Sequence, residues 1–148
     1  MFDSSYDFKF LGADTKDGVP RWRYAWKEVE DGNTYILKFK VENNDPTQWQ
    51  IIDWSMYAPQ VGDNPSIKTL ACRFNNISAI NDLDLFYGTI KAATIHFIEN
   101  NTDYTTLQCG PSTIKEHHAY HSQLAESIVS NRPWLTCRIL KNTLYISK

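Results

Sequence analysis

The sequence predicts a single α+β domain spanning residues 1–148. We expect a mainly antiparallel sheet, with an N-terminal β-meander and C-terminal strands, and two to three helices packed on one face. Residues 21–27 alternate basic and aromatic side chains at the period of a strand, and residues 35–41 alternate in the same way. Residues 64–77 and 113–131 instead space their apolar side chains as helices do. A length of 148 residues, 14% of them aromatic, suits one domain with its own core.

The clearest expected element is a hairpin between residues 21–27 and 35–41. Asp31-Gly32 lies between the two segments, and Asp-Gly is a preferred centre for a two-residue type I′ turn. That turn predicts the register. The expected apolar pairs are Trp22 with Val41, Tyr24 with Phe39, and Trp26 with Leu37. On the other face, Arg21 opposes Glu42, Arg23 opposes Lys40 and Lys27 opposes Ile36. A slip of one residue would mix the two faces, so pattern and turn favour the same register.

Two further strands complete the expected meander. A short strand around Phe8–Leu11 precedes the hairpin, and residues 48–57 follow it. Asn64-Pro65 then has the residues typical of a helix start, since Asn caps and Pro fits the first helical position.

The second half is less uniform in its patterns. Residues 83–99 fit a helical stripe, but the β-branched run at 94–98 favours a strand that pairs with residues 104–108. Thr113 and Glu116 form a capping box that opens a helix ending before Pro133. Residues 134–140 and 143–147 resemble two closing strands around a turn at residues 141–142.

Composition excludes several classes of protein. The net charge of −2 supports neither a general nucleic-acid binder nor an acidic DNA mimic. No apolar run approaches the roughly 20 residues needed to span a bilayer, so we expect no membrane association. The first five residues lack the basic and apolar stretches of a signal peptide, and three cysteines cannot form a complete disulfide framework. We therefore expect a reducing, cytoplasmic setting.

Five basic side chains form the candidate partner-binding site, because the hairpin register places them on one face. They are Arg21, Arg23, Lys27, Lys38 and Lys40. Such a face can contact phosphates or the acidic surface of a partner protein. The alternative is a solvated sheet face whose charges discourage aggregation.

Three histidines within five residues form a candidate metal or catalytic cluster. His117 and His121 are four positions apart on the last helix, and His118 and His121 are three apart, so either pair can share a face. Zinc would need further ligands, for which Cys109, His96 and Cys137 lack diagnostic spacing. The alternative is that one imidazole packs into the core while the others are solvated, and we expect no bound metal.

Cys109 is a candidate nucleophile, because it precedes Gly110 and the expected helix N-terminus. A helix dipole there would lower the pKa of a thiol and stabilise an oxyanion, and a histidine could serve as its base. The alternative is a buried, inert cysteine.

These features lead to three functional hypotheses. The first is a binding or inhibitory protein that occupies the surface of a partner protein, as inhibitors, immunity proteins and viral counter-defence factors do. It rests on a high aromatic content, a near-neutral charge and the lack of a complete catalytic motif or phosphate-binding loop, so we expect no cofactor. The second is a small hydrolase or transferase that uses His117 and His121, with or without Cys109 and a metal. The third is a single-strand nucleic-acid binder that uses the basic hairpin face.

Overall fold

The computed structural model describes residues 2–27, 34–42, 44–58, 66–68, 82–101, 103–109, 115–140 and 143–148. The strands are β1 (Phe8–Lys16), β2 (Val19–Lys27), β3 (Thr34–Glu42), β4 (Asp45–Ala58), β5 (Ser66–Lys68), β6 (Thr106–Cys109), β7 (Thr136–Leu140) and β8 (Thr143–Ser147), and the helices are α1 (Leu83–Asn100) and α2 (Lys115–Val129). These strands form one sheet in the order β1-β2-β3-β4-β6-β8-β7, and β5 pairs with β4.

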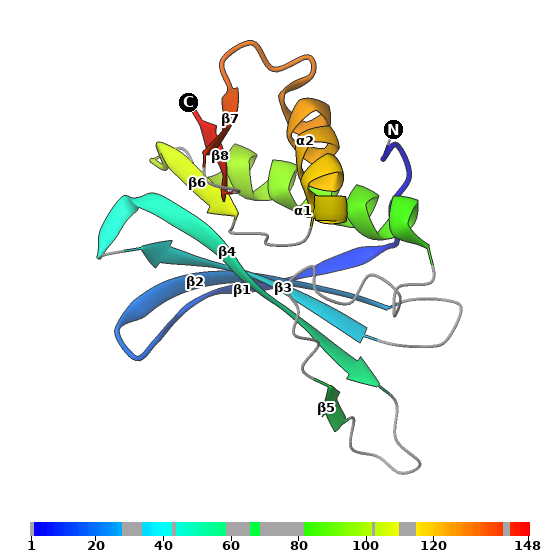
Figure 1. Ribbon diagram of the computed structural model, residues 1–148. Helices are drawn as coiled ribbons and strands as arrows, with labels where there is room; N and C mark the ends of the chain where they lie inside the picture. The colour runs from blue at the N-terminus through cyan, green and yellow to red at the C-terminus, as the bar shows by residue number, and fades with distance from the viewer. Residues whose placement is uncertain are drawn as a thin grey trace.

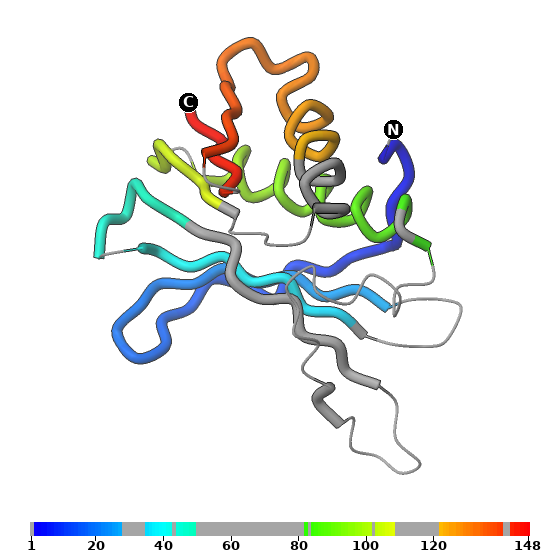
Figure 2. Tube along the Cα trace, viewed as in Figure 1, coloured from blue at the N-terminus to red at the C-terminus, as the bar shows by residue number. Residues whose placement is uncertain are grey.

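The fold is α+β, as the sequence predicts. The meander β1–β4 is antiparallel throughout, β4 and β6 run parallel, and β8 returns antiparallel to both β6 and β7. Both helices lie on the same side of the meander (Figure 1). The chain trace shows α1 crossing above the meander, with α2 beside β7 and β8 (Figure 2). In the described part of the chain, neither helix combines the length and apolar character needed to cross a bilayer.

The hairpin of β2 and β3 exists, but its expected register is wrong by two residues. Trp22 opposes Phe39, Tyr24 opposes Leu37 and Trp26 opposes Tyr35. The rings of Trp26 and Tyr35 stack with centroids 5.7 Å apart. Because a shift of two residues keeps every side chain on its original face, the alternation of the sequence fits both registers. The last described pair is Lys27 with Thr34, and the predicted turn at Asp31-Gly32 lies outside the described residues.

Residues 94–98 belong to a continuous helix, so the strand favoured there is wrong. The Asp82 side chain caps α1 by accepting a hydrogen bond from the Leu85 amide, at 3.1 Å. Phe86, Ile90, Ala93 and Phe97 follow at helical spacing and are fully buried. Burial of this stripe against the meander outweighs the weak strand preference of the β-branched residues.

The helix expected from Asn64-Pro65 is also wrong in the part that the structure describes. Ser66–Lys68 forms β5, which pairs antiparallel with Met56–Ala58 of β4. The rest of that expected helix lies outside the described residues. The last helix and the two closing strands are confirmed as α2, β7 and β8. Thr113, the expected capping residue of α2, lies outside the described residues.

The core between the meander and α1 is built largely from aromatic rings. Phe97 of α1 stacks on Phe39 of β3 with centroids 4.4 Å apart, and it meets Trp49 of β4 edge-on. At the other end of α1, Phe86 meets Tyr35 and Trp26 edge-on. The inner face of the meander is therefore filled by the core, and only its outer face is turned away from the helices.

Residues 2–6, here called the N-terminal strap, lie across α1 with Phe2 and Tyr6 buried. The Tyr6 amide donates a hydrogen bond of 2.8 Å to the Thr89 hydroxyl. Gly88 permits this approach, because a methyl group at that position would overlap the Ser4 carbonyl. The glycine is thus required by close contact of two backbone segments.

Candidate interaction surface

The five basic residues of the expected site lie on β2 and β3, on the face opposite the core. Arg21 opposes Lys40 and Arg23 opposes Lys38, while Lys27 opposes Thr34. All five alternate with the buried inner residues of the same strands. The corrected register places four cations in two facing pairs, where the expected register had placed Glu42 opposite Arg21. We call this set the outer basic strip.

One carboxylate organises the β1 side of the outer basic strip. Asp14 accepts two hydrogen bonds from Arg21, from Nε at 2.5 Å and from Nη2 at 2.8 Å. Arg23 Nη2 lies 3.5 Å from the second oxygen of Asp14. The hydrogen bonds from Arg21 hold the pKa of the Asp14 carboxyl below its usual range. Asp14 thereby holds two guanidinium groups side by side on β2.

The guanidinium groups of the strip are only partly screened by water. The side chains of Arg21 and Arg23 are 18% and 28% exposed. Arg23 Nε is buried and forms no hydrogen bond with any atom of the described residues. On the β4 side, Asp53 opposes Lys38 and Gln50 opposes Lys40 in the strand register. The result is a cationic strip with the Asp14 carboxylate on its β1 flank.

The histidine cluster lies on α2, but its chemistry is not described by the structure. His117, His118 and His121 fall in the first half of the helix, where only the backbone is described. Among the side chains that the structure describes, no group of three potential ligands comes together around a metal position. The metal or catalytic reading of these histidines therefore stays a prediction.

The three other proposed ligands lie on different elements. His96 lies on α1 and is hydrogen bonded to Tyr24, whereas Cys137 is a half-buried free thiol on β7. Cys109 is the last residue of β6, in the interior of the sheet between β4 and β8. Helix α2 begins at Lys115, after residues outside the described set, so the expected activation of Cys109 by a helix N-terminus stays a prediction as well.

A chain of three hydrogen-bonded side chains joins β2 to α1, and the sequence analysis missed it. Trp22 Nε1 donates to Tyr24 Oη at 2.7 Å, and Tyr24 Oη lies 2.5 Å from His96 Nδ1. Burial raises the pKa of Tyr24 well above its ordinary value, so this phenol stays neutral. The sequence offered one indication of this contact. Tyr24 faces the core and carries a hydroxyl that needs a partner, and His96 is next to the apolar Phe97. A neutral, buried phenol serves to fix the helix on the sheet.

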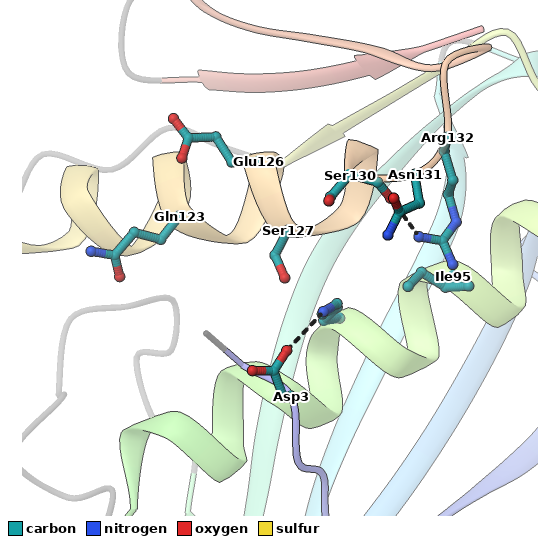
Figure 3. Close-up of a pocket in the computed structure, with 9 residues that line it drawn as sticks. Asp3, Ile95, Gln123, Glu126, Ser127, Ser130, Asn131 and Arg132 are labelled. Carbon is teal, nitrogen blue, oxygen red and sulfur yellow. Dashed lines mark hydrogen bonds and ion pairs between the residues drawn. The ribbon is translucent and has the colours of Figure 1, made fainter.

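A polar cleft of about 410 Å³ lies between α1, α2 and the N-terminal strap (Figure 3). Lys91 Nζ on its floor is 4.0 Å from the Asp3 carboxylate. Arg132 Nη1 donates to the carbonyl oxygens of Ile128 and Ser130, each at 3.2 Å. These cations already serve contacts within the chain, so the cleft is primarily a junction between the strap and the two helices.

Comparison of this chain with family models, with curated proteins and with solved structures finds no match.

Proposed function

We propose that this chain is a binding protein that acts by covering an acidic surface of a partner protein with the outer face of its meander. The observation that carries the proposal is that basic residues oppose one another at two neighbouring positions, Arg21 with Lys40 and Arg23 with Lys38. Both pairs are on the face of the meander that lies away from the two described helices. Like charges that oppose one another on a sheet repel, and Asp14 already offsets part of that repulsion at Arg21 and Arg23. An acidic partner surface offsets that repulsion when it binds.

Several features favour a protein partner over a nucleic acid. Asp14 already engages both arginines of β2, so the strip is not an unbroken cationic track. The buried rings of Tyr24 and Trp26 face the core, so they give the strip no platform on which bases stack. The net charge of −2 adds no long-range attraction for phosphates.

A protein that acts in this way fits the group of inhibitors, immunity proteins and counter-defence factors, which function by occupying a partner. The alternatives based on His117, His121 and Cys109 lack a described side-chain arrangement that favours them. They are distinguished by metal analysis of the purified protein, because zinc bound by wild type and absent from His121→Ala would favour the enzyme hypothesis.

The proposal is tested by exchanging charges on the strip. Arg23→Glu combined with Lys40→Glu should abolish co-purification of a stoichiometric acidic partner from the native source. The matched control, Arg23→Lys with Lys40→Arg, keeps both charges and should retain the partner. Arg23 is only 28% exposed and lies beside Asp14, so the charge-reversed variant should melt below wild type, and circular dichroism must show that it is folded before its binding is compared.

Added salt should weaken the wild-type complex, because the attraction across its rim is electrostatic. A partner that binds the charge-reversed variant as well as it binds wild type would contradict the proposal.

A further inference from the structure

The two edges of the sheet differ in how they are protected against pairing with another strand. The β1 edge is interrupted by a register shift between Phe10 and Gly12, and it carries the charges of Lys9, Asp14 and Lys16. Bulges and charges are the usual devices that keep an edge strand from pairing. Strand β7, at the other edge, pairs with β8 in continuous register from Thr136 to Leu140.

The β7 edge also exposes large apolar side chains. Trp134 is 59% exposed, Ile139 41% and Leu140 50%. Ile139 opposes the buried Leu144 in the ladder, so it lies on the core face of the sheet, yet it remains 41% exposed. In an antiparallel ladder, every second residue of an edge strand points its amide and carbonyl outward. No backbone hydrogen bond from β7 to a described segment other than β8 is present.

The charge of the residues around β7 indicates which kind of partner would cover this edge. The β7–β8 hairpin, residues 136–147, contains two basic side chains, Arg138 and Lys141, and no acidic one. Arg138 lies at the centre of β7, is exposed, and sits over the Tyr145 ring with its guanidinium carbon 5.3 Å from the centroid. Two copies of this chain joined through β7 would bring two such sets of like charge together. An acidic strand would complement the same charge.

We propose that β7 accepts an extended acidic segment of a partner protein by β-strand addition. The backbone of the added segment would pair with β7, one set of its alternate side chains would cover Ile139, and the other set would place carboxylates beside Arg138. This surface lies on different strands from the outer basic strip, and the proposal stands independently of the function proposed for that strip.

The probe for the test is a synthetic peptide of alternating valine and glutamate, blocked at both ends. Titration is followed by Trp134 fluorescence, and hydrogen exchange locates the binding site. We expect slower exchange of the β7 amides in the complex. A valine–lysine peptide should bind about two- to fivefold more weakly, which is the scale of an opposite-charge cross-strand pair. Arg138→Glu should reverse the preference between the two peptides.

Three controls separate strand addition from other modes of binding. A peptide N-methylated at alternate residues keeps its charge and side chains but loses half of its ladder hydrogen bonds, so it should not bind. Ile139→Lys should weaken binding of the valine–glutamate peptide while leaving the melting temperature nearly unchanged. Arg23→Glu with Lys40→Glu should bind the peptide as wild type does, which keeps this test independent of the outer basic strip.

The proposal is overturned if the β7 amides exchange at the same rate with and without the peptide, or if the methylated peptide binds equally well. It is also overturned if the free chain is a dimer whose β7 amides become unprotected on dilution, because the occupant would then be a second copy. Binding to anionic lipid vesicles that protects Trp134 without protecting the β7 amides, in the absence of peptide binding, would instead assign this edge to a membrane surface.

Discussion

At the scale of single residues, the clearest constraint is the chain from Trp22 through Tyr24 to His96. Tyr24 Oη accepts the Trp22 indole hydrogen and shares a short contact with His96 Nδ1, so one hydroxyl serves two partners. Phe10 packs against both Trp22 and His96, with centroids 4.4 and 5.6 Å away. The hydroxyl therefore determines how α1 rests on β2.

Tyr24→Phe should lower the free energy of unfolding by about 1–3 kcal/mol, because Trp22 Nε1 and His96 Nδ1 lose their partner in a half-buried site. Urea denaturation measures this loss. The matched control is Tyr104→Phe, since the Tyr104 hydroxyl is also buried but forms no hydrogen bond with the described residues. Its removal should be neutral or slightly stabilising. Equal losses in the two variants would show that the hydroxyl of Tyr24 has no special role.

Residue roles were predictable from sequence only where strand periodicity decides them. Alternation placed Arg21, Arg23 and Lys40 on one face, and the structure agrees. The contact of Asp14 with Arg21 was not predictable, because it depends on the pairing of β1 with β2 and on the shift at Gly12. The partner of Tyr24 was hidden for a similar reason, since His96 lies on a helix distant in sequence.

At the scale of elements, local pattern identified strands and helices better than it identified their registers and limits. The two-residue shift of the β2–β3 hairpin leaves its faces unchanged, so alternation alone could not reveal it. The β-branched side chains of Thr94 and Ile95 do favour a strand, but this preference is a property of the local sequence alone. It was outweighed by burial of Phe97 and Ile90 against the meander, which depends on tertiary structure.

Gly88→Ala should destabilise the protein by about 1–3 kcal/mol, because the added methyl group would displace the Ser4 backbone from α1. This sign is opposite to that of an ordinary helical glycine, where alanine stabilises by about 0.5–1 kcal/mol. Thermal unfolding measures the change. In a chain that lacks residues 2–6, Gly88→Ala should instead raise the melting temperature, as it does at an ordinary helical glycine. Stabilisation of the full chain by Gly88→Ala would contradict the packing of the N-terminal strap on this helix.

At the scale of the whole molecule, the sheet has one covered face, one face turned away from the helices and two unlike edges. The α+β class and the position of the meander were predictable, because they follow from periodicity and chain length. The parallel contact of β4 with β6 and the position of β7 at an edge were not, since they depend on the order in which distant strands assemble. The outer basic strip and the β7 edge were not predictable in full for the same reason, since each depends on which strands lie next to one another in the folded sheet.

The proposed function requires that the outer basic strip be accessible in the free protein and covered in its complex. Lysine acetylation followed by mass spectrometry tests it most directly, by comparing the rates at Lys27 and Lys40 in the free protein and in the purified complex. Lys9, on the edge strand β1, and Lys148, near the opposite edge, serve as references. We expect Lys27 and Lys40 to react several times more slowly in the complex while Lys148 changes little. Unchanged rates at Lys27 and Lys40 in a complex of full occupancy would contradict the account.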